Sequence, residues 1–281
     1  MSPDSSKRAA DPVRTPPFLP FLDGPPDFAA KLAPIEVKDW IGRDSEAEPW
    51  LNEKCLLMKL ARARVCAGDL DGKAAEEVLS LIMSATGATP LQDMPTALEE
   101  AASLVSDDLC ILEEERRGDW RLTAGVLCAP TFWTLPERIG LDLGGLHGPV
   151  PGGDPQLSGR IGRVFSGLQP DKPLQRFNWT VQASGERHTP ERPSASGKTL
   201  KDLHLRVERQ TVRRLDGSGA IVFAIRVCVD PLLPLLEVPE TREAFEDAWL
   251  GAPKTVRTYK CWDELEPLVA AACRSASSQA L

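Results

Sequence analysis

Residues 203–227 read LHLRVERQTVRRLDGSGAIVFAIRV, and this stretch carries the strongest strand signal in the chain. Leucine and valine at the odd positions 203–207 alternate with polar residues at the even positions 204–210, so the two kinds of side chain fall on opposite faces of a strand. The Asp-Gly-Ser-Gly sequence at 216–219 has the composition of a hairpin turn. We therefore predict a β-hairpin with strands at 203–214 and 219–228.

The neighbouring segments extend this hairpin into a sheet. Residues 174–182 also alternate, with Arg176, Asn178 and Thr180 on one face and Phe177, Trp179 and Val181 on the other. Residues 109–112 and 120–128, joined across an Arg-Gly-Asp turn, predict a second hairpin. Between the hairpin and 174–182, short helices within 131–147 and a helix at 156–168 are expected. This order predicts an α+β fold, an antiparallel sheet with helices on one face, and it matches a PAS-type fold.

The remaining sequence suggests three parts. Residues 1–30 contain seven prolines and are expected to form a non-helical arm that lies on the domain surface or stays mobile. Residues 31–105 form a helical preface, with helices predicted at 46–67, 73–85 and 95–105. Residues 106–281 contain the sheet and two closing helices, near 240–250 and 262–273.

Composition excludes some classes of function. The formal net charge of -8 disfavours nucleic acid and anionic membranes as partners. No run of about 18 apolar residues could span a membrane, and no apolar segment follows the N-terminal Met-Ser-Pro. The seven cysteines are scattered and never form a Cys-x-x-Cys pair, which is typical of buried thiols in a reducing compartment. We therefore expect a cytoplasmic protein.

His147 is the strongest candidate for a metal ligand. Of the three histidines, it alone follows an apolar, helix-compatible segment, at 132–146, and precedes a Gly-Pro-Val-Pro exit. A neutral imidazole at the mouth of a pocket is a natural ligand for an iron porphyrin. The alternative is a histidine that caps or hydrogen-bonds a turn.

Three segments together resemble a known family. They read CAPTFW at 128–133 running on to LHGPVP at 146–151, RFNW at 176–179, and LRVERQTVRRL at 205–215 followed by SGAIVFAIR at 218–226. In order and spacing they are similar to the heme-dependent oxidative N-demethylases, the heme subunits of dimethylamine-oxidising enzymes, over roughly residues 45–265. Two departures stand out, since the family's Phe-Pro-Ser is here Ala-Pro-Thr with Phe132 inserted, and its proline after Arg-Leu is Asp216.

The resemblance implies a PAS-like domain that binds heme b and uses dioxygen to hydroxylate an N-methyl carbon. The product would collapse to an amine and formaldehyde, and the substrate would be a small secondary or tertiary methylamine. Electrons would come from NADPH through FMN and a 2Fe-2S centre on a separate reductase. The chain shows neither a nucleotide-binding fingerprint nor a cysteine cluster for such centres, which fits a heme subunit that depends on a reductase.

The resemblance also implies roles for particular residues. His147 maps onto the family's His-x-Pro-Val-Pro motif and would ligate the iron. Arg176 and Arg206 would bind heme propionates or orient a partner carboxylate, unless they lie on a solvated sheet face. Glu208 would neutralise an ammonium substrate or relay protons, unless it is only a salt-bridge partner.

Three further residues complete the expected site. Trp179 and Arg209 are expected to contact the heme, although Trp179 equally suits a core position. Tyr259, the only tyrosine, would donate a hydrogen bond in the pocket or serve packing alone. Two other functions are kept open, a heme-based PAS sensor without turnover and a degenerate family member that binds a small amine or nothing.

Overall fold

The computed structural model describes residues 15–29, 31–42, 44, 47–89, 94–148 and 155–279. The prolines at 149 and 151 after His147, and half of the predicted N-terminal arm, lie outside these residues. Within them, one seven-stranded antiparallel sheet has the order β1-β5-β6-β7-β3-β4-β2. The strands are β1 (Ala33–Pro34), β2 (Cys66–Gly68), β3 (Asp108–Arg116), β4 (Asp119–Val126), β5 (Leu174–Gln182), β6 (His204–Arg214) and β7 (Ile221–Pro231).

The long hairpin β6–β7 is confirmed. Its register runs from His204 opposite Pro231 to Arg214 opposite Ile221. The turn closes with a hydrogen bond from the Leu215 amide to the Ala220 carbonyl (2.8 Å), and Gly219 has a φ of +74°. The second hairpin, β3–β4, and strand β5 also form where the alternation predicted them.

The helices are α1 (Ala47–Leu60), α2 (Arg62–Val65), α3 (Lys73–Thr86), α4 (Ala97–Ser103), α5 (Leu143–His147), α6 (Pro155–Gly167), α7 (Leu232–Leu236), α8 (Pro239–Leu250), α9 (Lys254–Tyr259) and α10 (Glu266–Gln279). None of the helices in the described residues is long and apolar enough to span a membrane. The single helix predicted at 46–67 is instead two helices, α1 and α2, interrupted at Ala61, and the chain joins the sheet as β2 from Cys66. Within 131–147 only α5 is helical.

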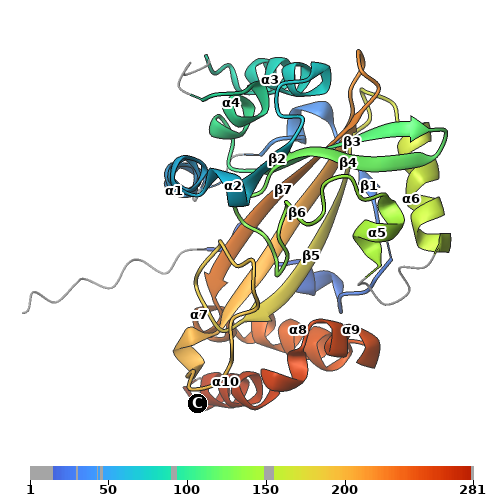
Figure 1. The fold of residues 1–281 in the computed structure, drawn as a ribbon. Coiled ribbons are helices and arrows are strands. Elements are labelled where there is room, and N and C mark those ends of the chain that lie inside the picture. The colour runs from blue at the N-terminus through green and yellow to red at the C-terminus, as the bar shows by residue number, and fades with distance from the viewer. Residues whose placement is uncertain are drawn as a thin grey trace, which may run out of the picture.

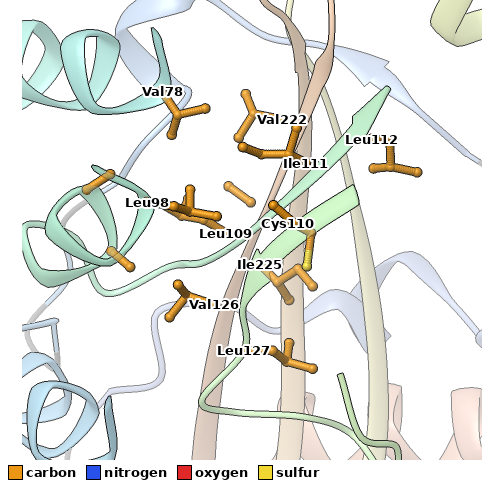
Figure 2. Packing of buried hydrophobic residues seen from close by; sticks show 14 of the residues in the cluster. Val78, Leu98, Leu109, Cys110, Ile111, Leu112, Val126, Leu127, Val222 and Ile225 are labelled. Carbon is orange, nitrogen blue, oxygen red and sulfur yellow. The ribbon is translucent and has the colours of Figure 1, made fainter. Parts of the chain in front are cut away.

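Helices lie against both faces of the sheet (Figure 1). On one face, Val78 of α3 and Leu98 of α4 point toward Leu109, Ile111 and Val222, as Figure 2 shows. On the other face, Trp120 of β4 meets the ring of Phe165 from α6 edge to face, at 5.7 Å between centroids. The α+β class is confirmed, but the expected placement of the helices on one face needs this correction. The PAS-like label stays a prediction.

The described part of the N-terminal arm is not confined to the surface. It contains a short 3-10 helix, η1 (Pro20–Asp23), and the ring of Phe21 is only 1% exposed. This ring packs against Trp179 of β5 and Phe245 of α8. The prolines do exclude an α-helix here, but the apolar ring of Phe21, which lies between prolines in the sequence, is still buried in the core.

Candidate functional site

A row of polar residues crosses strands β5 and β6 on the sheet face that α5 and α6 cover. The register places Arg176 opposite Gln210, Asn178 opposite Glu208 and Thr180 opposite Arg206. Residues directly opposite each other in an antiparallel pair lie on the same face and interact. The alternation in the sequence therefore placed Arg176, Arg206 and Glu208 together, as predicted.

Arg206 is fully engaged by its own protein. Its guanidinium makes five hydrogen bonds, one for each N–H: to the Thr131 hydroxyl, the Gln182 side chain and the carbonyls of Ala129, Pro130 and Arg187. Burial lowers the pKa of Arg206 to about 10, so the group stays cationic at neutral pH. This residue clamps the segment 129–131 onto the sheet, and no N–H is left over for a ligand.

Glu208 is held by three donors. One carboxylate oxygen, Oε1, accepts from the Thr131 hydroxyl, and the other, Oε2, accepts from Asn178 Nδ2 at 3.3 Å and Gln210 Nε2 at 2.5 Å. Thr131 accepts from Arg206 and donates to Glu208, so its single proton points at the carboxylate. Glu208 is thus an oriented and nearly buried acceptor.

Lys260, which the sequence did not single out as a site residue, joins the same network. Its side chain comes from the turn after α9 and is 7% exposed. The ammonium donates to Asn178 Oδ1 and to the Trp179 carbonyl, both at 2.9 Å. Burial lowers the pKa of Lys260 to about 8, while the charge of Glu208 opposes this shift. A lysine at the end of a short helix resembles a solvated one, so its sequence context did not predict this burial.

His147, at the end of α5, presents one ring nitrogen as a possible ligand. Its Nδ1 lies 2.8 Å from the Leu143 carbonyl, which can only accept, so Nδ1 carries the proton and Nε2 keeps its lone pair. Burial lowers the pKa of His147, and the nearby charge of Arg176 lowers it further. The imidazole is therefore neutral at pH 7, which is the form that binds metals.

The other two histidines make a similar bond, so that bond alone does not select His147. Nδ1 of His188 lies 2.9 Å from the Cys128 carbonyl, and Nδ1 of His204 lies 2.9 Å from the Asp202 carbonyl. What sets His147 apart is its place at the end of α5, close to the charge of Arg176. That arginine, Arg176, carries a buried Nε–H that donates to no acceptor among the described residues.

Trp179 and Arg209 are not brought to this site. Both side chains lie on the opposite face of the sheet, because their positions are odd where Asn178 and Glu208 are even. The guanidinium of Arg209 donates to Gln175 and to the carbonyls of Asp39 and Trp40. Trp179 belongs to an aromatic cluster with Phe21, Phe245 and Trp262. Their expected contact with a heme on the His147 side is not supported by this geometry.

Tyr259 lies at the edge of the site. Its side chain is 38% exposed, and its ring meets Phe28 edge to face at 5.5 Å between centroids. Its charge interaction with Glu208 shows that the phenol is near the polar row. The packing role kept open for this residue has a partner in Phe28, and the role as a hydrogen-bond donor stays a proposal.

Residues 70–270 match the family model described as haem-dependent oxidative N-demethylase, alpha subunit-like. The chain belongs to this family. The matched range includes His147, Arg176, Glu208 and Lys260, so the network above lies wholly inside the family's domain. The family's description names haem dependence and oxidative N-demethylation, and "alpha subunit-like" indicates an enzyme with more than one subunit.

Proposed function

We propose that this N-demethylase family member is the heme-binding subunit of an oxidative N-demethylase. Its substrate is a small secondary or tertiary methylamine, its co-substrate is dioxygen and its products are the demethylated amine and formaldehyde. Electrons come from NADPH through a separate reductase that carries FMN and a 2Fe-2S centre. The family match over residues 70–270 is the observation that carries this proposal.

We propose that His147 and Arg176 would hold a heme b beside the β5–β6 face. His147 would hold the iron through Nε2, since Nδ1 is occupied by the Leu143 carbonyl. Arg176 would bind a propionate, because its buried Nε has no hydrogen-bond partner among the described residues and it lies close enough to His147 to lower that pKa. When bound, the heme supplies the iron redox chemistry that oxidises an N-methyl carbon.

The other polar residues would shape the site around the substrate. Arg206 holds the segment 129–131 against the sheet, which fixes the Thr131 hydroxyl between Arg206 and Glu208. Glu208 would accept or return a proton through Thr131 at its Oε1 atom. Because Lys260, Arg176 and Arg206 already balance its charge, Glu208 suits this role better than the capture of a free ammonium.

The heme assignment is tested by reconstituting the purified protein with heme and recording its absorption spectrum. His147→Ala should lose or strongly shift the Soret band, because the iron loses its axial nitrogen. His188→Ala is the matched control, since that imidazole makes the same kind of carbonyl bond and should leave the band unchanged. A His147→Ala spectrum equal to that of the wild type would exclude His147 as the ligand.

The activity is tested separately with heme-loaded protein, NADPH and a flavin/iron–sulfur reductase. Formaldehyde should appear when a secondary or tertiary methylamine is added, in proportion to the NADPH consumed. If no methylamine gives formaldehyde while heme is bound and electrons are supplied, the proposed activity is wrong and a heme-based sensor without turnover is the better interpretation.

A further inference from the structure

The turn that carries Lys260 is held by an unusual clamp. The guanidinium of Arg192 lies over the ring of Phe132, 4.0 Å from its centroid. The same group donates to the Lys260 carbonyl at 2.8 Å and to the Tyr259 carbonyl at 3.5 Å. Arg192 therefore ties the turn after α9 to the segment that contains Thr131.

Two residues of this clamp have strained backbones. Phe132 has a φ of +64° and Cys261 a φ of +52°, a region that residues other than glycine rarely adopt. Both line the same small cavity beside Arg192. Such strain persists where the surrounding contacts demand it, and it concentrates at functional sites. Here the strained residue Cys261 directly follows Lys260, whose ammonium group points into the protein.

The inward lysine determines how Asn178 lies. An ammonium can only donate, so the Asn178 atom that it contacts is the acceptor Oδ1. The other amide atom, Nδ2, then faces Glu208 and donates to Oε2. The Lys260 ammonium and the Glu208 carboxylate thus favour the same orientation of the Asn178 amide, and loss of the Lys260 charge removes one of these two constraints.

We propose that Lys260 is a positioning residue of the site, which fixes Glu208 through Asn178 and supplies one of its counter-charges. This rests on the proposed function for what Glu208 does, but the contacts that position Glu208 are independent of it. The charged groups that face Lys260 are Glu208 from β6, Arg176 from β5 and Arg192 from the segment after β5, with Tyr259 beside it in the chain.

A consequence is a pH dependence above neutrality. Lys260 is ammonium below its pKa of about 8 and becomes a neutral amine above it. The neutral amine no longer balances the charge of Glu208 and no longer dictates which amide atom of Asn178 it meets. The site is therefore expected to lose its ordering as the pH rises through this value, well before an exposed lysine would titrate.

The first test measures Lys260 directly in the heme-loaded protein. The side-chain carbons of the lysines are labelled, and their NMR shifts are followed with pH, the Lys260 signal being the one absent in Lys260→Met. Its midpoint should lie near 8. In Glu208→Gln the midpoint should fall, because the carboxylate that favours the ammonium is gone. The proposal is overturned if Lys260 titrates with the midpoint of an ordinary exposed lysine, or if its midpoint is the same in Glu208→Gln as in the wild type.

The second test measures demethylation against pH. Lys260→Met should lower kcat/KM at least about tenfold below pH 8 and abolish the fall in kcat/KM at higher pH, whereas Lys260→Arg should keep activity to higher pH because its charge does not titrate. Lys254→Met, on the exposed start of α9, is the control and should match the wild type.

If Lys260→Met is active with a wild-type pH profile, this inference fails and the proposed function stands. If no variant, wild type included, releases formaldehyde but the NMR coupling is present, the proposed function fails and the positioning role stands.

Discussion

At the scale of single residues, the alternation of β5 and β6 says more about the site than composition does. It separates Arg176, Asn178 and Glu208 from Trp179 and Arg209 by parity alone, and the register confirms that separation. Placing Trp179 and Arg209 in the same site as Arg176 conflicted with the alternation itself. What the sequence could not supply were the partners, because the five bonds of Arg206 and the inward turn of Lys260 depend on loops distant in the chain.

A second feature at this scale is a buried carboxylate, that of Asp107, on the sheet face opposite to Glu208. The Asp107 carboxylate is fully buried near Arg226, Lys54 and Arg209, and no hydrogen bond from the described residues reaches either oxygen. Burial raises the pKa of Asp107 to about 6, against the pull of the three cations. An isolated carboxylate would have been predicted on the surface, so this cluster was not visible in the sequence.

The raised pKa of Asp107 gives a prediction about stability and pH. Between its ordinary pKa and about 6, the folded protein binds more protons at Asp107 than the unfolded chain does, so the contribution of this residue to stability falls as the pH rises. Asp107→Asn cannot titrate. Relative to wild type, its free energy of unfolding should rise by up to about 3 kcal/mol from about pH 4 to about pH 7.

Urea unfolding at several pH values measures this difference. Asp247→Asn, on the exposed side of α8, is the matched control and should track the wild type within about 0.5 kcal/mol. If the difference in free energy of unfolding between Asp107→Asn and the wild type does not change with pH, Asp107 keeps an ordinary pKa in the folded protein.

At the scale of elements, the main strands and most helices follow from periodicity, whereas the edge strand β2 does not. The apolar spacing of 46–67 is helical to its end, but the chain leaves the helix at Ala61 and Cys66–Gly68 pairs with β4. The reason lies in a tertiary contact. Gly68 has a φ of +89°, and a Cβ there would be 2.0 Å from the Thr123 carbonyl oxygen. The sequence shows a glycine but not the strand that passes so close to it.

This contact predicts that Gly68→Ala is far more damaging than a comparable change elsewhere. Gly87, which ends α3 with a φ of +67°, is the matched control because a Cβ there meets nothing within 4 Å. Gly87→Ala should cost about 1 kcal/mol, the penalty of a left-handed backbone. Gly68→Ala should cost at least about 2 kcal/mol more, since β2 must also move away from β4. Equal losses in chemical unfolding would mean that β2 is not held at this distance.

At the scale of the whole molecule, segments far apart in the chain complete one another. Strands β1 and β2, from the part predicted as a helical preface, form the two edges of the sheet. The predicted boundary between residues 31–105 and 106–281 stays a proposal. Because β1 and β2 belong to the same sheet as the later strands, the two parts are not expected to fold independently. Near the site, Trp262 donates to the Thr180 hydroxyl at 2.9 Å, so the aromatic cluster and the polar row share an anchor two residues from Lys260.

The last prediction concerns the N-terminal segment, in which Phe21 is the buried ring. Phe21 is 1% exposed and meets Phe245 edge to face at 5.6 Å, which joins the start of the chain to its C-terminal helices. Phe21→Ala should therefore lower the free energy of unfolding by about 3–5 kcal/mol, the usual cost of a cavity left by a buried phenylalanine. Leu22→Ala, the next residue in η1 and 57% exposed, should cost under about 0.5 kcal/mol. If the two variants unfold alike, the segment is not anchored through Phe21, and the surface arm that the prolines predicted would be the better description.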